Sequence, residues 1–195
     1  MAIGILCDFD PATDRASLKC IALTATDFTG PAQRVLFRAL SIHGHSRHSW
    51  SPTFARARDL LLDSPHIAGY VKDLTVRFSW ANRPENHDQL EHILRTLPKV
   101  RCFVVQRAGV GWDALRPGLK SAILALMGFP VLDTLHLIHI LDVPPTVIPG
   151  AARNIRVLSL QNVSVQKLEA GTTSEAGAAP RLAHLTLYRN AFNLL

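Results

Sequence analysis

The sequence predicts an α/β protein, with a short N-terminal helical segment followed by an irregular solenoid whose parallel sheet has about five strands. One apolar cassette occurs five times: an apolar residue, a second three places later and a third two places after that. Successive cassettes start 23 to 32 residues apart, a period typical of solenoids, whose units bury their apolar faces against one another. The cassettes are Val71, Leu74 and Val76; Val100, Phe103 and Val105; Leu132, Leu135 and Leu137; Ile155, Leu158 and Leu160; and Leu182, Leu185 and Leu187.

The last part of each cassette alternates apolar and other residues, which is the pattern of a short strand with one buried face. A proline stands two residues before three of the cassettes, at Pro98, Pro130 and Pro180, where the preceding element must end. The strands are therefore expected to follow helices or turns along the chain.

The N-terminal part predicts a helical hairpin. One helix is expected over residues 15–23 and a second from Pro31 through Leu40, with Phe28 in the turn between them. Residues 42–51 then form a polar linker rich in histidine. We interpret it as a solvated loop and not a zinc site, because no cysteine or carboxylate joins the histidines. The chain thus divides into 1–41, 42–51 and 52–195.

Further helices are expected between the strands. The first covers residues 54–62. The second is capped by Asp88 and ends before Pro98, and the third covers residues 119–127. Prolines predict an extended connection or a single 3₁₀ turn over residues 143–149, and residues 169–179 are small and polar, as in a mobile segment. No amphipathic capping unit follows the last cassette, so we expect a longer native protein or a partner at that end.

Composition narrows the class of protein. Hydrophobic residues make up 48% of the chain, yet no apolar run approaches the roughly 18 residues of a membrane span. The N-terminus lacks signal-peptide features, so we expect an intracellular protein of the cytoplasm or nucleus. Three cysteines without CxxC spacing predict neither a disulfide framework nor a zinc site. The net charge of +6 is scattered over single residues, which argues against a nucleic-acid partner.

We find no catalytic motif. The chain has no G-x-G-x-x-G, Walker A or G-x-S-x-G sequence, and Cys102 has no evident histidine or lysine to activate it. No catalytic residue, metal site or cofactor is therefore predicted. An α/β enzyme with an unrecognised site is the rival hypothesis, and strand order separates it, since a doubly wound sheet reverses direction at a switch point.

Alternation along the strands predicts a target-binding face. If the later cassette positions face the core, the residues between them face the other side of the sheet. These intervening strand positions include polar, apolar and aromatic residues, a composition that both a recognition surface and an ordinary solvated sheet face would have. Three rows result: Asp73, Cys102, Thr134, Val157 and His184; Thr75, Val104, His136, Ser159 and Thr186; and Arg77, Gln106, Ile138, Gln161 and Tyr188.

Residues 14–38 resemble the C-terminal part of the F-box of large fungal protein families, through Asp14-Arg-Ala-Ser-Leu18, Cys20-Ile-Ala-Leu23, Phe28, Ala32-Gln33 and Leu36-Phe-Arg38. The family's opening Leu-Pro-x-Glu helix is absent. The resemblance implies docking on the adaptor subunit of an SCF-type ubiquitin ligase. The implied adaptor contacts are Leu18, Ala22, Leu23, Phe28, Leu36 and Phe37.

The five cassettes resemble the degenerate leucine-rich repeats that follow this box in F-box/leucine-rich-repeat proteins, although the asparagine after the strand occurs only once, at Asn190. The two resemblances together imply a non-enzymatic substrate-recognition subunit that binds an unknown protein target. A stand-alone repeat scaffold with a decayed F-box is the alternative among binding proteins.

Overall fold

A computed structural model describes residues 26–44, 53–78, 84–107, 111–166 and 182–188. The strands are β1 (Ala39–His43), β2 (Asp73–Phe78), β3 (Cys102–Arg107), β4 (Thr134–Ile138), β5 (Val157–Gln161) and β6 (His184–Tyr188). The helices are α2 (Thr26–Leu36), α3 (Phe54–Asp63), α4 (Pro84–Thr96), α5 (Pro117–Met127) and α6 (Val147–Ala152), with 3₁₀ turns η1 (Pro65–Gly69) and η2 (Trp112–Ala114).

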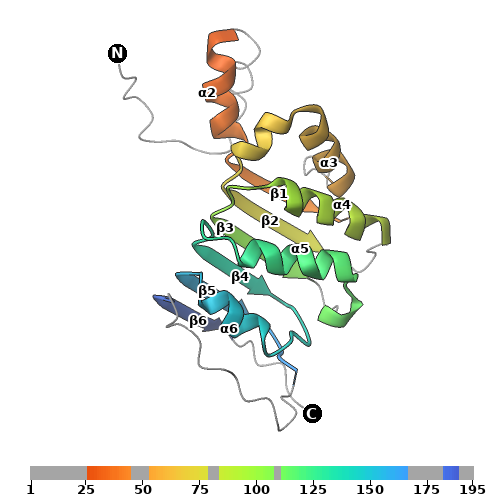
Figure 1. The fold of residues 1–195 in the computed structure, drawn as a ribbon, viewed down its shortest axis with the longest axis vertical. Coiled ribbons are helices and arrows are strands. Elements are labelled where there is room, and N and C mark those ends of the chain that lie inside the picture. Colours follow the sequence, from red (N-terminus) through yellow and green to blue (C-terminus); the bar gives the residue numbers. More distant parts are fainter. Residues whose placement is uncertain (1–25, 45–52, 79–83, 108–110, 167–181, 189–195) are drawn as a thin grey trace.

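The strands form one six-stranded sheet in the order of the sequence, and every neighbouring pair is parallel (Figure 1). The α/β class and the parallel sheet predicted from the cassettes are thus confirmed. Since the order never reverses, the described strands contain no switch point.

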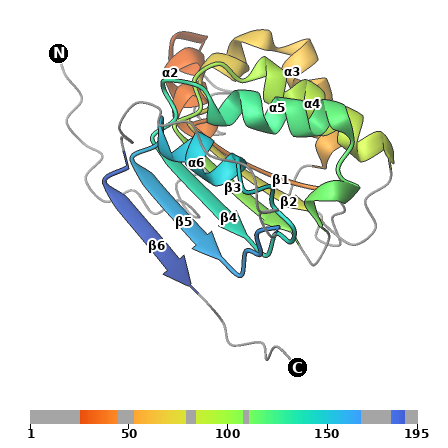
Figure 2. The ribbon, with the colours of Figure 1, turned by 60° about the horizontal axis from the view of Figure 1, so that its bottom comes forward.

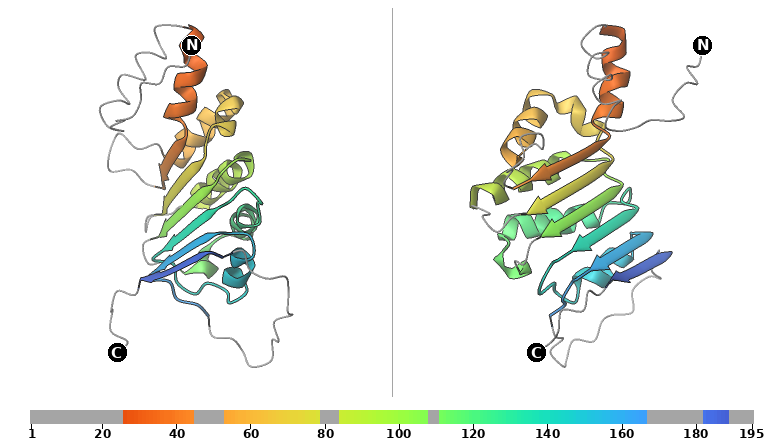
Figure 3. Two further views of the ribbon diagram at one scale, coloured as in Figure 1. Left: turned by 90° about the vertical axis from the view of Figure 1, so that its left-hand side faces the viewer. Right: turned by 180° about the vertical axis from the view of Figure 1, so that it is seen from behind.

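All helices between strands lie against one face of the sheet. The layer consists of α3, α4, α5 and α6, while α2 stands beyond β1 at the end of the sheet (Figure 2). Parallel crossovers are almost always right-handed, so a sheet that grows in one direction receives each helix on the same side. The opposite face carries none of the described helices (Figure 3).

The core lies between the sheet and this helical layer, and the cassettes fill it as predicted through most of the chain. Val71, Val100, Leu132 and Ile155, the first positions of four cassettes, have no exposed surface. The strand positions from Leu74 to Leu158 are also buried, and Leu160 packs against the same core from its edge. From the helices, Leu61, Leu90, Ile93, Leu119 and Ile123 complete the layer.

A sixth cassette lies at the start of the sheet. The expected helix through Leu40 is wrong in its last turn, because α2 ends at Leu36 and β1 begins at Ala39. Phe37, Leu40 and Ile42 have the cassette spacing, and the register pairs Leu40 with Leu74 and Ile42 with Val76. The first of them packs against the core and the other two are buried in it. Part of the expected linker is therefore strand.

Two further helices differ from expectation. Helix α4 begins at Pro84, earlier than the expected cap at Asp88, since proline suits the first helical position. The connection expected to be extended or a single 3₁₀ turn contains the α-helix α6, in which Pro149 occupies the first turn. Proline is tolerated there because the amide that it lacks would have no helical partner.

The last cassette is less buried than predicted. Leu185 and Leu187 pair in register with the core residues Leu158 and Leu160, yet they are 54% and 66% exposed. No described helix covers this part of β6, and the connection from β5 to β6 includes residues 167–181, which lie outside the described residues. The core is thus closed over the first strands and open at the last one.

The chain leaves β4 and β5 through equivalent turns. His139 and Asn162 follow the two strands directly and both have a left-handed backbone, with φ of 55° and 51°. The side-chain nitrogen Nδ2 of Asn162 lies 3.3 Å from Nδ1 of His139, and the backbone N–H of His139 donates to the Gln161 carbonyl at 2.8 Å. A side-chain and backbone link therefore joins these two repeats directly after their strands.

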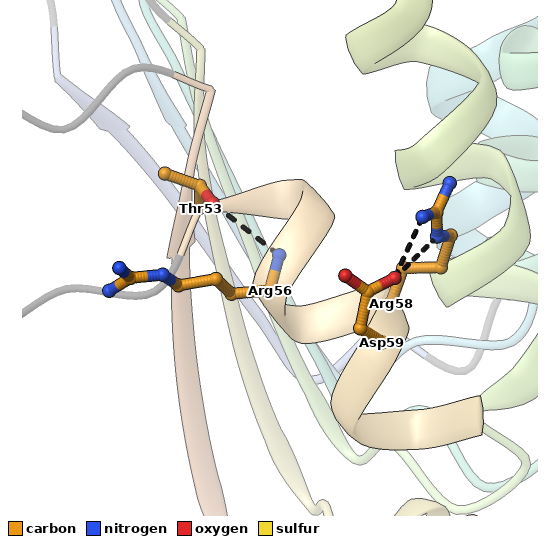
Figure 4. A network of polar contacts seen from close by, with 4 residues as sticks. All are labelled: Thr53, Arg56, Arg58 and Asp59. Atoms are coloured by element: carbon orange, nitrogen blue, oxygen red, sulfur yellow. Dashed lines mark hydrogen bonds and ion pairs between the residues drawn. The ribbon is translucent and has the colours of Figure 1, made fainter. Parts of the chain in front are cut away.

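Helix α3 is capped by Thr53, whose Oγ1 accepts a hydrogen bond from the Arg56 amide at 3.4 Å (Figure 4). Such caps contribute about 0.5–2 kcal/mol to stability, and this long bond suggests the lower end. On the next turn Arg58 pairs with Asp59 at 2.7 Å, an exposed contact that contributes little (Figure 4). The cap fixes where the first crossover helix starts.

Leu135→Ala should lower the free energy of unfolding by about 2–5 kcal/mol, because it opens a cavity in the closed part of the core. The adjacent His136→Ala should change it by no more than about 0.5 kcal/mol, because that side chain faces away from the helices. Urea denaturation of the two variants measures this difference. Equal losses would contradict the assignment of the two strand faces.

Candidate protein-binding face

The face of the sheet that carries no described helix, which we call the open face, carries the three predicted rows (Figure 3). The strand register confirms the alignment of these rows. Asp73 pairs with Cys102, then Thr134, Val157 and His184 follow on successive strands. The second and third rows are aligned in the same way, through Thr75 and Arg77. Residues far apart in the sequence are thus brought into straight lines across the five strands β2 to β6.

Sequence reasoning missed the first member of each row. Ala39, Ser41 and His43 of β1 pair with Asp73, Thr75 and Arg77. The spacing of Phe37, Leu40 and Ile42 was the signal that could have revealed this strand. It was hidden because these residues follow directly on a helical pattern. The open face therefore extends one strand further than predicted, to β1.

Most side chains of the open face are only partly accessible. Thr75, Val104, His136 and Ser159 in the middle row are all half-buried, because side chains on adjacent strands shield one another. Arg77 on β2, next to the edge strand β1, and His184 on the last strand, β6, are exposed. The surface combines an apolar and hydroxyl-bearing centre with charged or titratable ends, a distribution also found in protein interfaces.

Two groups on the open face have shifted pKa values. Burial lowers the pKa of the His136 imidazole, so this side chain is held in the neutral form. Burial, and secondly the carboxylate of Asp73, raises the pKa of the Cys102 thiol. A raised pKa disfavours the thiolate, which is the reactive form of cysteine. Both shifts make this surface less charged, as suits a contact surface.

The residues assigned to adaptor contact by the F-box resemblance are only partly described. Leu18, Ala22 and Leu23 lie outside the described residues, and Phe28 lies in α2 rather than in the expected turn. Leu36 ends that helix and is half-buried. Phe37 packs against the core in the position that Val71 occupies in the next repeat.

The remaining expectations concern metals and membranes. His43 lies in β1, whereas His45 and His48 lie outside the described residues. Within the described ranges, no group of three or more His, Cys, Asp and Glu side chains could hold a metal ion. Nor does any described helix combine the length and apolar character that crossing a bilayer requires.

The stability of the protein should fall as the pH drops below about 6.5, with a contribution from His136. Its pKa is lower in the folded than in the unfolded chain, so in this window only the unfolded chain takes up the proton. The contribution is intact above about pH 6.5 and is lost progressively down to the folded pKa. His136→Gln should therefore reduce the drop in melting temperature between about pH 7.5 and about pH 5.5.

The matched control is His92→Gln, which removes an exposed histidine of α4. This variant should keep the pH dependence of the parent. An unchanged drop in the His136 variant, or the same reduction in both variants, would contradict the assignment.

Comparison with known proteins returned no matching family model, no matching curated protein and no matching solved structure.

Proposed function

We propose that this chain is a non-enzymatic protein-recognition module that binds its target on the open face. The observation that carries the proposal is the one-sided helical layer, which leaves three aligned rows of partly accessible side chains on the other side of the sheet. A face of this kind offers a broad, rigid surface on which many side chains contact a partner at once. Such breadth suits a protein target better than a small substrate.

We further propose that the strands and helices form an irregular, leucine-rich-repeat-like solenoid. Support comes from the sequential strand order, the six cassettes in register and the repeated turn at His139 and Asn162. The same order weighs against a doubly wound enzyme, which binds its ligand where the strand order reverses. Each repeat contributes one strand to the proposed binding face.

Attachment to an SCF-type ubiquitin ligase is the next part of the proposal, and it rests on the resemblance of residues 14–38 to an F-box. In this role the helical segment would dock on the ligase adaptor while the sheet holds the target for ubiquitylation. The packing of Phe37 against the core favours the alternative, a stand-alone repeat scaffold, since this side chain already has a structural role.

The open face is tested by placing a photo-crosslinking amino acid at Gln106, on the open face, or at Ser121, an exposed residue of α5. In cells that make the protein, we expect discrete protein adducts from position 106 and none from position 121. Adding His136→Glu beside position 106 should abolish the adduct by placing a charge in the contact. Adducts from position 121 alone, or equal adducts from both, would contradict the proposed face.

Adaptor docking is tested by size-exclusion chromatography of the purified chain with the ligase adaptor subunit. We expect the parent to co-elute and a Leu18→Asp, Leu23→Asp double variant to elute alone, with circular dichroism showing both folded. Phe37 is left unchanged because its substitution would disturb the core. Failure of a well-folded parent to co-elute would favour the stand-alone scaffold.

A further inference from the structure

A basic pocket lies at the amino ends of the first three strands and meets the open face at Asp73, the first β2 residue of its rows. Its volume is about 540 Å³. The lining includes five cationic side chains and one aromatic ring, from Arg34, Arg38, Lys72, Lys99, Arg101 and Tyr70. Asp73 is the carboxylate among the described residues that line it. We call this site the amino-end pocket.

The repeat itself assembles the pocket. Arg38, Lys72 and Arg101 each stand directly before a strand, and the backbone ladder begins with them. The Lys72 amide donates to the Arg38 carbonyl at 2.8 Å, and the Arg101 amide donates to the Lys72 carbonyl at 2.7 Å. Neighbouring strands lie about 4.8 Å apart, so three cationic residues are fixed side by side.

The cationic run is confined to this end of the sheet. The next residue in the ladder is Asp133, whose amide donates to the Arg101 carbonyl at 2.8 Å, and the one after it is Arg156. The sign of the charge therefore changes before β4. A localised ligand of matching size fits this arrangement better than a long polyanion that would follow the whole edge.

The described residues compensate little of this charge. Arg38 Nε lies 3.7 Å from the Asp73 carboxylate, and the two side chains are 72% and 44% exposed, so water screens this contact. Between residues that the structure describes, no ion pair involves Lys72, Lys99 or Arg101. Desolvation lowers the pKa of Lys72. The positive charges of Lys99, Arg101 and Arg38 lower it further. Mutual repulsion of this kind is relieved when an anion enters.

From these observations we propose that the amino-end pocket binds a small soluble ligand with several linked phosphate groups, such as a triphosphate. Arg38 and Arg101 are two strand spacings apart, about 10 Å at the backbone, so a single phosphate would leave part of the charge unmatched. Linked phosphates contact cations on all three strands together. Arginine guanidinium groups suit this role because they bind phosphate oxygens in pairs.

Single-stranded nucleic acid is the less favoured ligand. Such ligands combine backbone contacts with stacking of bases on aromatic rings along a groove. Among the described residues that line the pocket, Tyr70 is the single aromatic one, and the Arg34 guanidinium already lies over its ring at 5.8 Å from the centroid. The Tyr70 ring also packs edge-to-face with the His66 ring, with 5.8 Å between the two centroids.

The test is isothermal titration calorimetry of the full chain with sodium tripolyphosphate at low salt. We expect a Lys72→Gln, Arg101→Gln double variant to bind at least about tenfold more weakly than the parent. The matched control is Arg153→Gln, Arg156→Gln, which removes the same charge where the exposed Arg156 precedes β5 as Arg101 precedes β3. This control should stay within about twofold of the parent, as expected for distant exposed charges.

A substitution of opposite sign completes the test. Asp73→Asn removes the carboxylate that the described residues contribute to the lining, and it should tighten tripolyphosphate binding severalfold. The proposal is overturned if the parent does not bind, if both double variants lose affinity equally, or if Asp73→Asn weakens binding. Equal affinity for orthophosphate would rule out a linked-phosphate ligand, and tighter binding of a short single-stranded RNA would identify a nucleic-acid site instead.

Discussion

The parallel backbone ladder, built in sequence order, is the constraint on which the rest of this structure depends. Each strand contributes only a few buried side chains, so no repeat can close a core by itself. The ladder brings these small contributions into one continuous layer, from Ile42 in β1 to Leu158 in β5. Because right-handed crossovers add every helix on the same side, the ladder also decides that one face is buried and the other remains open.

Two surfaces of different chemistry follow from the same ladder. Alternation within the strands sends Thr75, Val104 and His136 to the open face, in register and largely uncharged. The position just before each strand instead lies at an edge, where Arg38, Lys72 and Arg101 form part of the amino-end pocket. A broad neutral face suits contact with a protein, whereas a compact cationic pocket suits a small anion.

The repeats are irregular in their connections but regular in their strands. The helices vary from α4, with 13 residues, to α6, with six, and yet each returns the chain to the next parallel strand. The left-handed turn recurs directly after β4 and β5, where the side chains of His139 and Asn162 lie within 3.3 Å of each other. Burial is most complete where long helices cover the sheet, and it declines toward Leu185 and Leu187 at the far edge.

The sequence by itself determined the strands β2 to β6, their parallel arrangement and the three rows of the open face. Those features depend on short-range alternation, which is visible in Leu135, His136 and Leu137. Only the tertiary structure decided that Phe37, Leu40 and Ile42 begin the sheet, because a helical pattern runs directly into them. The tertiary structure likewise brought Arg38, Lys72 and Arg101 into one pocket, since these residues are scattered along the chain and meet through strand pairing.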